Sequence, residues 1–291
     1  MKKIAILTNY NISDKVSAAV AVAQKLAAYE CEILIPYYGK DKIARIRRLR
    51  KEMVFKSAED IYAEADVVIV LGGDGTILES ARRAADRATP IIGINLGRLG
   101  YMAELELSEI DMLDKYFKEE YTIEKRSMVS VEITDMHGNL KSSANALNDA
   151  VVSNGSISRI VDLELYSGEE QVASYRSDGI IVATPTGSTA YSMSAGGPII
   201  SPDVHCLCVT PICPHSLAAR PIIFPDTATL KIKNVCVREK SLYLTLDGRN
   251  NYEIVRGDVI TIKKSELSTN LIRLKKSDFY NKLRKKMNEN V

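Results

Sequence analysis

The feature that most constrains the fold is a short apolar run, residues 67–71, that leads directly into Gly72-Gly73-Asp74-Gly75-Thr76. A continuous apolar run of this length suits a strand buried on both faces of a parallel sheet. The segment after Thr76 has helical composition, so the glycines lie where a strand feeds a helix. Glycine lets the backbone turn tightly and approach a ligand, and ligands of open α/β sheets bind at the carboxyl ends of strands. This junction therefore predicts a binding site.

Asp74 narrows the chemistry of that site. Helix N-termini attract phosphate, but a carboxylate repels it, so an anion cradle alone would not use aspartate. The residue suits a metal site, or a site where it accepts a proton from a hydroxyl that attacks a phosphoryl group. A glycine-rich turn with an acidic helix cap is the alternative.

Bulk properties limit the class of protein. The 291 residues favour two domains, and an apolar fraction of 46% is enough for real cores. A formal charge of +2 argues against a dedicated nucleic-acid binder. No apolar run approaches the length of a membrane span, and the N-terminal run is too short for a signal peptide. An odd number of cysteines, five, favours free thiols in a reducing cytosol. We therefore expect a cytoplasmic protein without membrane or nucleic-acid partners.

One cluster could in principle hold zinc. It consists of His205, Cys206, Cys208, Cys213 and His215. No Cys-x-x-Cys pair is present, and two of the cysteines fall on one face of an apparent strand, where cysteine acts as a small hydrophobe. We therefore favour packing over metal binding and assign no metal ligand from the protein.

The first hundred residues alternate between strand-like and helix-like segments. Strands are predicted at residues 3–7, 31–35, 67–71 and 91–94. Helices are predicted at residues 13–29, 40–51, 58–65 and 76–88. Such alternation predicts an α/β domain, residues 1–100, with a parallel sheet and crossover helices.

After Tyr101 the pattern changes. One more helix is predicted at residues 108–118, and runs of period two follow it. They lie at residues 127–134, 163–166, 171–175, 180–183, 229–233, 241–246 and 259–263. Further strands are predicted at residues 150–153 and 206–210. Turn residues separate them, so residues 101–269 are predicted to form a mostly antiparallel β domain. A final amphipathic helix, residues 277–287, is expected to pack back on the first domain, so that residues 270–291 complete it.

A second polar constellation follows the predicted strand at 180–183. The loop 184–189 carries several hydroxyls and a glycine, and Tyr191 lies just beyond it. Hydroxyls and backbone amides at a strand–helix junction suit sugar hydroxyls, base edges and phosphates. The tyrosine ring could stack on a base, although a buried structural ring is equally common. A Ser/Thr turn that caps a helix is the alternative.

Two further pieces have the chemistry of a nucleotide site. Asn148 and Asp149 precede a predicted strand, where they could bind an adenine edge and a ribose diol. Arg176 and Asp178 lie two apart and share a face if that stretch is extended. A turn pair and a surface ion pair are the alternatives. From the residues alone, Arg176 is a candidate phosphate contact.

Together these motifs resemble the ATP-dependent NAD kinase family of bacterial type. The match extends from Gly72-Gly73-Asp74-Gly75-Thr76 through segments 93–101, 124–128, 148–149, 178–198 and 211–217 to Asp247-Gly248. The glycine-rich motif alone is shared with diacylglycerol and sphingosine kinases, whereas residues 184–191 in order with the rest are more specific. One departure is Asp149, where the family usually has glutamate.

The resemblance implies a reaction and residue roles. ATP would phosphorylate the 2′-hydroxyl of the adenosine ribose of NAD to give NADP, with Asp74 activating or orienting that hydroxyl. The implied fold is an α/β domain, an interposed β-sandwich and a returning C-terminal segment. The phosphate path would be shaped by Gly72, Gly73, Gly75 and Thr76. The residues implied to contact NAD are Gly75, Tyr101, Asn148, Asp149, Asp178, Thr186, Thr189, Ala190, Tyr191 and Ser194. Of these, Asn148, Thr186 and Thr189 would contact the adenine, and Asp149 the ribose diol.

Partners and alternatives follow from the same motifs. The chain has no P-loop and no Gly-x-Gly-x-x-Gly, so ATP would be held otherwise, with Mg²⁺ or another divalent cation on its phosphates, and NAD would be a substrate. The family implies a homodimer or homotetramer, and polyphosphate remains open as a donor. A lipid kinase would need an apolar pocket or membrane-facing surface, and a non-catalytic NAD(P)-binding regulator would bind dinucleotide without turnover.

Overall fold

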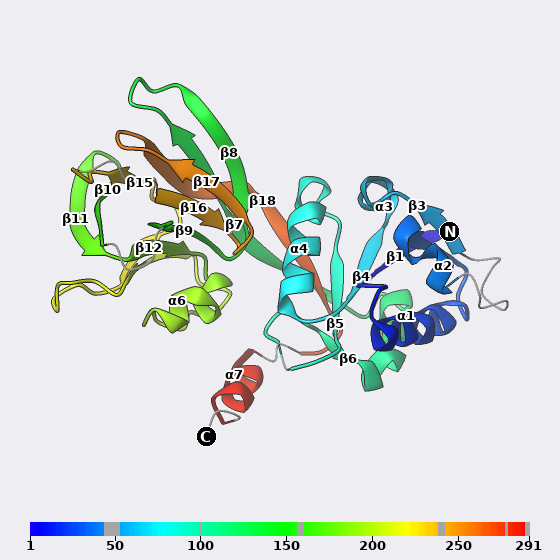
Figure 1. The fold of residues 1–291 in the computed structure, drawn as a ribbon. Coiled ribbons are helices and arrows are strands. Elements are labelled where there is room, and N and C mark those ends of the chain that lie inside the picture. Colours follow the sequence, from blue (N-terminus) through cyan, green and yellow to red (C-terminus); the bar gives the residue numbers. More distant parts are fainter. Residues whose placement is uncertain (44–52, 99, 156–159, 238–241, 277–278, 289–291) are drawn as a thin grey trace. The chain divides into compact units, whose positions relative to one another are not determined.

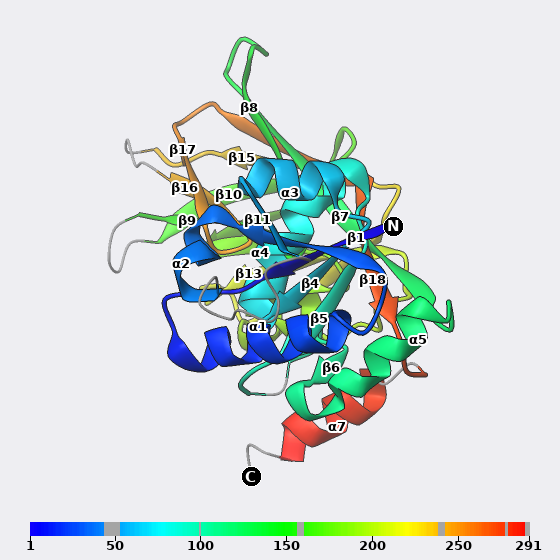
Figure 2. The same ribbon diagram turned by 90° about the vertical axis from the view of Figure 1, so that its right-hand side faces the viewer.

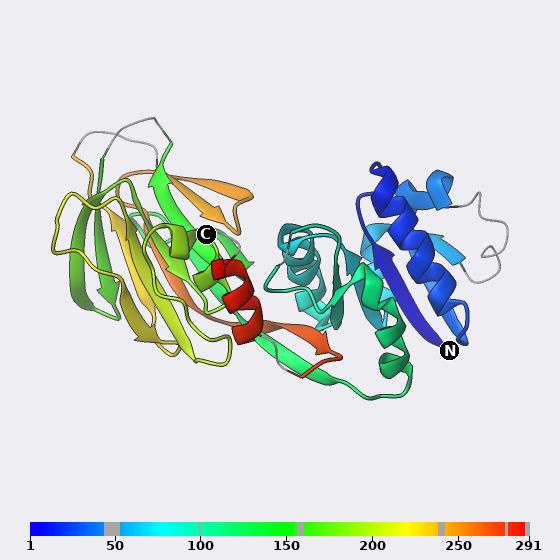
Figure 3. The same ribbon diagram turned by 90° about the horizontal axis from the view of Figure 1, so that it is seen from below.

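The computed structural model describes residues 1–43, 53–98, 100–155, 160–237, 242–276 and 279–288. The chain forms two compact units (Figure 1). Unit 1 comprises Met1–Lys125 and Thr269–Val291, and unit 2 comprises Arg126–Ser268. Two long strands, β7 (Thr122–Thr134) and β18 (Val259–Arg273), contribute residues to both units (Figure 3).

Unit 1 is built on a parallel sheet. Its strands are β1 (Lys2–Leu7), β2 (Cys31–Pro36), β3 (Met53–Lys56), β4 (Val67–Leu71) and β5 (Ile91–Asn95), in the order β3-β2-β1-β4-β5. The order reverses between β1 and β4, which pair in parallel with Ala5 opposite Val68. The helices α1 (Ser13–Leu26) and α4 (Asp74–Ala84) cover opposite faces of this sheet (Figures 1 and 2).

Burial explains why these segments are strands and helices. Every residue of β4 and of β5 is buried, as a strand covered on both faces requires. Helix α1 turns a face of small and branched residues inward, which includes Ala19, Val22 and Leu26. These side chains join the apolar residues of β1, β2 and β4 in one core. The predicted parallel α/β unit is therefore confirmed.

Several element limits differ from the predictions. Helix α1 ends at Leu26 instead of residue 29, and α4 begins at Asp74 instead of residue 76. Strand β3 was not predicted, and α3 (Ala58–Glu64) follows it. Of the helix predicted at 40–51, α2 (Lys40–Ile43) is present, and residues 44–51 lie outside the described part of the chain.

The predicted boundary at residue 100 differs from the division in the structure. Residues 101–125 belong to unit 1, where β6 (Leu105–Glu106) extends the sheet beside β5. The short helices η4 (Leu107–Leu113) and α5 (Asp114–Phe117) follow, and Leu113 and Tyr116 enter the core of that unit. The pattern changes at Tyr101 because the connection is made of short elements, not because the core ends there.

The chain returns to unit 1 through the end of β18. Leu271 pairs in parallel with Ile91 of β5, and Ile272 and Leu274 are buried in the unit 1 core. Beyond it, α7 (Phe279–Asn288) begins close to the predicted helix at 277–287, although residues 277 and 278 are outside the described ranges. Among the described helices, none is long and apolar enough to cross a membrane.

Unit 2 consists of two antiparallel layers around one apolar core. The first is a six-stranded sheet, β14-β13-β12-β9-β16-β17. Its strands are β9 (Asp149–Asn154), β12 (Gly179–Ala183), β13 (Cys206–Ile212), β14 (Ile222–Pro225), β16 (Leu242–Leu246) and β17 (Asn250–Ile254). The second layer contains β7, β8 (Leu140–Ala146), β10 (Val161–Ser167), β11 (Glu170–Ser177), β15 (Leu230–Asn234) and β18.

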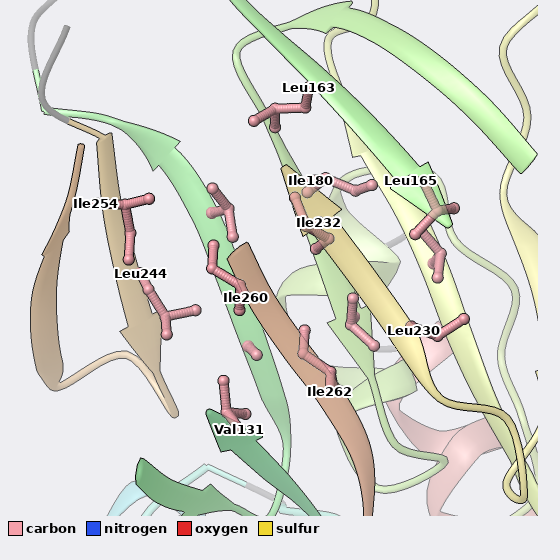
Figure 4. Close-up of a cluster of buried hydrophobic side chains, with 14 of the residues drawn as sticks. Val131, Leu163, Leu165, Ile180, Leu230, Ile232, Leu244, Ile254, Ile260 and Ile262 are labelled. Atoms are coloured by element: carbon pink, nitrogen blue, oxygen red, sulfur yellow. The ribbon is translucent and has the colours of Figure 1, made fainter. Parts of the chain in front are cut away.

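Side chains from both layers meet in this core (Figure 4). Ile180 and Leu244 come from the first layer, and Leu165, Ile232 and Ile260 come from the second. The mostly β second unit is therefore confirmed, and β8, β14 and β17 are additional to the predicted strands. In β13, Cys206 and Cys208 are buried, where they act as small apolar groups.

Candidate active site

Asp74 lies at the start of α4, directly beyond the carboxyl end of β4. Its Oδ2 accepts a hydrogen bond from the backbone N–H of Tyr101 at 2.8 Å. Its Oδ1 accepts one from the N–H of Met102 at 3.1 Å. Each carboxylate oxygen keeps acceptor capacity beyond these bonds. Two backbone donors thus fix the direction of the carboxylate without neutralising it.

Glycines make this arrangement possible. A Cβ on Gly100 would lie 2.1 Å from Oδ1 of Asp74. The loop can therefore come this close to the carboxylate only because residue 100 is a glycine. A Cβ on Gly72 would lie 2.7 Å from Oγ1 of Thr76. At Gly73 and Gly75 a Cβ would meet nothing within 4 Å, so open space surrounds the backbone at the N-terminus of α4. That space, at the N-terminus of a helix, suits a phosphate.

The position in the sheet also favours a ligand. Strands β1 and β4 are neighbours where the strand order reverses, and ligands of open α/β sheets bind in the crevice at such a point. The hydroxyl of Thr8, just after β1, donates to the carbonyl of Leu71 at 2.8 Å. This bond joins the ends of the two strands beside the Gly72–Thr76 segment.

The C-terminal segment fixes the loop that orients Asp74. Nη1 of Arg273 donates to the carbonyl of Met102 at 3.2 Å, and Nζ of Lys282 donates to the carbonyl of Ala103 at 2.6 Å. Nζ of Lys286 lies 4.1 Å from the ring centroid of Tyr101. The side chain of Tyr101, predicted to contact NAD, is therefore buried under α7. The sequence predicted that this segment returns to the first domain, but it did not predict the contacts of this segment with residues 101–103.

In unit 2, the turn that carries Asn148 and Asp149 is held by Asp247. The carboxylate of Asp247 accepts hydrogen bonds from the N–H groups of Leu147, Asn148 and Asp149 at 2.9, 2.7 and 3.2 Å. Asp247 has a φ of 50°, a left-handed conformation that asparagine and aspartate tolerate better than most residues. Only the family motif indicated Asp247, and nothing in the sequence indicated this positioning role.

The loop 184–189 also contacts the turn that carries Asn148 and Asp149, through the carbonyl groups of that turn. The N–H of Thr184 donates to the carbonyl of Asn148 at 2.9 Å, and its hydroxyl donates to the carbonyl of Leu147 at 2.6 Å. A Cβ on Gly187 would lie 2.0 Å from that Asn148 carbonyl oxygen, so this loop also requires a glycine. The two predicted polar segments, 148–149 and 184–191, are thus brought together in one unit.

A pocket of about 380 Å³ opens beside this turn. Asn148, Asp149, Ala190 and Tyr191 line it, together with Asp247. Oδ1 of Asn148 is buried and has no hydrogen-bond partner within the described ranges. A buried acceptor without a partner costs free energy, so a ligand that donates to it would be favoured. Four of the predicted contacts with NAD therefore line one pocket.

Other predicted residues are placed differently. The hydroxyl of Thr186 is buried and receives a hydrogen bond from Nη1 of Arg126 at 3.3 Å. Arg176 lies 4.0 Å from Asp162 in an exposed ion pair. Among the residues of unit 2 that are predicted to bind ligand, those that do not line the pocket are Arg176, Asp178, Thr186, Thr189 and Ser194. Their predicted contacts stay predictions.

Asp149 has an unusual titration. Its burial, and then the negative charge of Asp247, raise its pKa to about 7. In the unfolded chain an aspartate has a pKa of about 3.9. At pH values between the unfolded and the native pKa, Asp149 is therefore protonated in the native state but ionised in the unfolded state. The free energy of unfolding is therefore expected to fall as the pH rises from about 4 to about 7.

The variant Asp149→Asn tests this titration because its amide cannot ionise. Without ligand, the variant is expected to have a higher Tm than the parent at pH 8, and this advantage should vanish toward pH 4. Thermal unfolding across that range measures it, with the exposed Asp86→Asn as control. A Tm difference that is the same at pH 5 and pH 8 would contradict the assigned titration.

Comparison with known proteins places the chain in a family. Residues 6–121 match the ATP-NAD kinase N-terminal domain, and residues 147–274 match the C-terminal domain. The NAD kinase of Caldanaerobacter subterraneus subsp. tengcongensis is 41% identical over 292 residues, covering 99% of this chain and 100% of that protein. The chain belongs to the NAD kinase family.

Further members agree with this assignment. The NAD kinase of Carboxydothermus hydrogenoformans is 45% identical over 225 residues, covering 77% of this chain and 80% of that protein. A yeast NADH kinase complexed with NADH has a TM-score of 0.89 at 24% identity and covers 98% of this chain and 86% of that one. An Archaeoglobus fulgidus NAD kinase in complex with ATP has a TM-score of 0.73 at 24% identity, with 98% and 99% covered. The NAD kinase fold expected from the motifs is therefore confirmed. Membership of the NAD kinase family also excludes the lipid-kinase alternative.

Proposed function

We propose that this chain transfers the γ-phosphoryl group of ATP to the 2′-hydroxyl of the adenosine ribose of NAD, with Asp74 as the residue that acts on the attacking hydroxyl. Family membership gives the reaction, the ATP-dependent phosphorylation of NAD to NADP. The observation that supports the role of Asp74 is its carboxylate, fixed by two backbone donors at the point where the strand order reverses.

Asp74 would orient the hydroxyl and accept its proton as the oxygen attacks. The new O–P bond forms at the γ-phosphorus while the bond to the β-phosphate oxygen breaks, so that ADP leaves. Phosphoryl transfer depends on positioning and charge stabilisation more than on covalent chemistry. The N-terminus of α4 and the open space at Gly73 and Gly75 would receive the phosphates.

The pocket beside Asn148 would hold NAD. The unpaired Oδ1 of Asn148 can accept from the amino group of adenine, and the Asp149 carboxylate can accept from ribose hydroxyls. Tyr191 lines the same pocket with its ring half-exposed, as a stacking platform for a base requires. We retain Thr186, Thr189, Ala190 and Ser194 as further contacts of the dinucleotide.

The residues at Asp74 fit a divalent cation that arrives with ATP. Within the described ranges, no cluster of three or more His, Cys, Asp or Glu side chains could hold a metal by itself. Mg²⁺ commonly binds through one or two carboxylates plus substrate phosphates, and the oxygens of Asp74 keep acceptor capacity for it. When bound, the cation would neutralise charge on the phosphates.

Assembly, location and donor range belong to the same proposal. We propose a homodimer or homotetramer in the cytoplasm that uses ATP as the phosphate donor; whether polyphosphate can replace ATP is a question for the same assay. The five cysteines are free thiols, which suits a reducing compartment.

A coupled assay tests the proposed function. Purified protein is incubated with NAD, ATP and Mg²⁺, and NADP is detected with an NADP-specific dehydrogenase. We expect NADP to form only when ATP is present. NAD binding by calorimetry without any NADP would instead identify a regulator that binds dinucleotide without turnover.

The variant Asp149→Ala tests the acceptor site. Removal of the carboxylate is expected to raise the KM for NAD by about tenfold, the effect of losing about 1.4 kcal/mol of binding, while the KM for ATP stays constant. Steady-state kinetics with each substrate varied in turn measures this. An unchanged KM for NAD would remove Asp149 from the ribose site.

A further inference from the structure

The backbone N–H groups of loop 101–103 are committed to Asp74. Those of Tyr101 and Met102 donate to the two oxygens of its carboxylate at 2.8 and 3.1 Å. The orientation of the proposed proton acceptor therefore depends on where this loop lies. Any side chain of unit 1 that holds the loop in place is, for the same reason, a candidate positioning residue for the transfer.

A buried carboxylate, Glu104, fixes the end of this loop to the end of strand β18. Its Oε1 accepts hydrogen bonds from the N–H groups of Leu274 and Lys275, at 2.8 Å each. Its Oε2 accepts one from Nη1 of Arg273 at 3.1 Å, and the same Nη1 donates to the carbonyl of Met102 at 3.2 Å. This first anchor is part of the folded framework, because removing one partner would leave a buried charge unpaired.

Helix α7 supplies a second anchor. Nζ of Lys282 donates to the carbonyl of Ala103 at 2.6 Å, a short charge-assisted hydrogen bond. The ring centroid of Tyr101 lies 4.1 Å from Nζ of Lys286 and 6.1 Å from the ring centroid of Phe279. The spacing of these three α7 residues, three and four apart, places them on one face of the helix. That face therefore contacts the loop.

The rest of α7 adds little to the fold of unit 1. None of its ten residues, Phe279–Asn288, is buried, and none belongs to the apolar core of the unit. Most helices in proteins are stabilised by packing of an apolar face, and a helix of this length is marginal without it. The attachment of α7 therefore depends on its contacts with the loop that orients Asp74.

We infer that α7 is a positioning element for the proposed reaction, in which Lys282 holds loop 101–103 and, through it, the Asp74 carboxylate. The inference rests on the proposed function, because the orientation of Asp74 matters only if Asp74 acts on the attacking hydroxyl. A catalytic group that is misplaced by about 1 Å can lose about 10²-fold in rate. Loss of this anchor should therefore lower kcat and leave substrate binding unchanged.

The variant Lys282→Met tests the anchor with little risk to the helix. Methionine removes the ammonium group but is unbranched and has a helix propensity close to that of lysine. We expect kcat to fall by about tenfold, while the KM for NAD and the KM for ATP stay within about twofold of the parent values. A rise in either KM with an unchanged kcat would overturn the inference.

The matched control is Lys285→Met, which removes the same charge from an exposed position of the same helix. It should keep the parent kcat. An equal loss of kcat in both variants would overturn the inference, because it would show that only the charge of α7 matters.

A double-mutant cycle identifies the route by which Lys282 acts. If it acts through Asp74, Lys282→Met should cost little further activity in the Asp74→Asn background, since residues that act as a unit are not additive. Losses that multiply would show that Lys282 contributes to turnover by another route, and the inference would fail.

Hydrogen–deuterium exchange separates this inference from the proposed function. It is measured without substrates on the parent and on the two lysine variants. We expect Lys282→Met to speed exchange in peptides that contain Tyr101 and Met102 by about tenfold, and Lys285→Met to leave it unchanged. Faster exchange in a protein that makes no NADP would support the anchor, and only the proposed function would fail. Unchanged exchange in Lys282→Met would overturn the inference even if NADP forms.

Discussion

Replacement of Asp74 by asparagine is expected to lower kcat by roughly 10²–10⁴-fold, while NAD still binds. Asparagine keeps the size of the side chain but is not a base at neutral pH. Its amide also places an N–H group against one of the two backbone donors, Tyr101 or Met102, that now hold the carboxylate. The variant therefore loses both the carboxylate that we propose as proton acceptor and part of the orientation of this side chain.

Steady-state kinetics and calorimetry with NAD would measure this effect. Asp86→Asn is the matched control, because Asp86 is exposed and lies after α4 in the same unit. The control should retain the parent kcat and the parent Kd for NAD. Turnover by Asp74→Asn within about threefold of the parent would remove Asp74 from the chemical step, and the phosphorylation reaction would then need another acceptor for the proton.

Replacement of Gly100 by alanine is expected to lower kcat by about 10²-fold, the cost of moving a catalytic group by about 1 Å. The new Cβ would lie 2.1 Å from Oδ1 and 2.6 Å from Cγ of Asp74. The carboxylate cannot simply rotate away, because the N–H groups of Tyr101 and Met102 hold it. Either the carboxylate or the loop must move, and each movement displaces the group that we propose as proton acceptor.

A double-mutant cycle identifies the cause of that loss. If Gly100 serves to admit the Asp74 carboxylate, Gly100→Ala should cost little further activity in the Asp74→Asn background, since residues that act as a unit are not additive. Losses of kcat that simply multiply would show that the alanine acts elsewhere. Thermal unfolding of the single variants would separate an effect on the site from a general loss of stability.

Local pattern was sufficient for much of the fold. Strand β4 was predicted within its observed limits because five consecutive apolar residues bounded by glycines suit a short strand that is covered on both faces. The alternation of strands and helices predicted the parallel order, since parallel neighbours need crossover connections. The predicted boundary at residue 100 differs from the division after Lys125 because β6, η4 and α5 are too short to show a period, although Leu113 and Tyr116 belong to the first core.

The sequence alone determined the chemistry of this protein. The residues Gly72 to Thr76, Asn148 with Asp149, and the hydroxyl-rich loop predict a phosphoryl-transfer enzyme of the NAD kinase family, because the residues of each motif are close along the chain. The match to the family confirms that membership. Only the tertiary structure decided what holds those groups in place. Asp247 lies about a hundred residues from the turn it fixes, and Arg273 and Lys282 about 170 to 180 residues from the loop that orients Asp74. Contacts so distant along the chain leave no periodic trace in sequence, because they exist only after the strands and helices have packed.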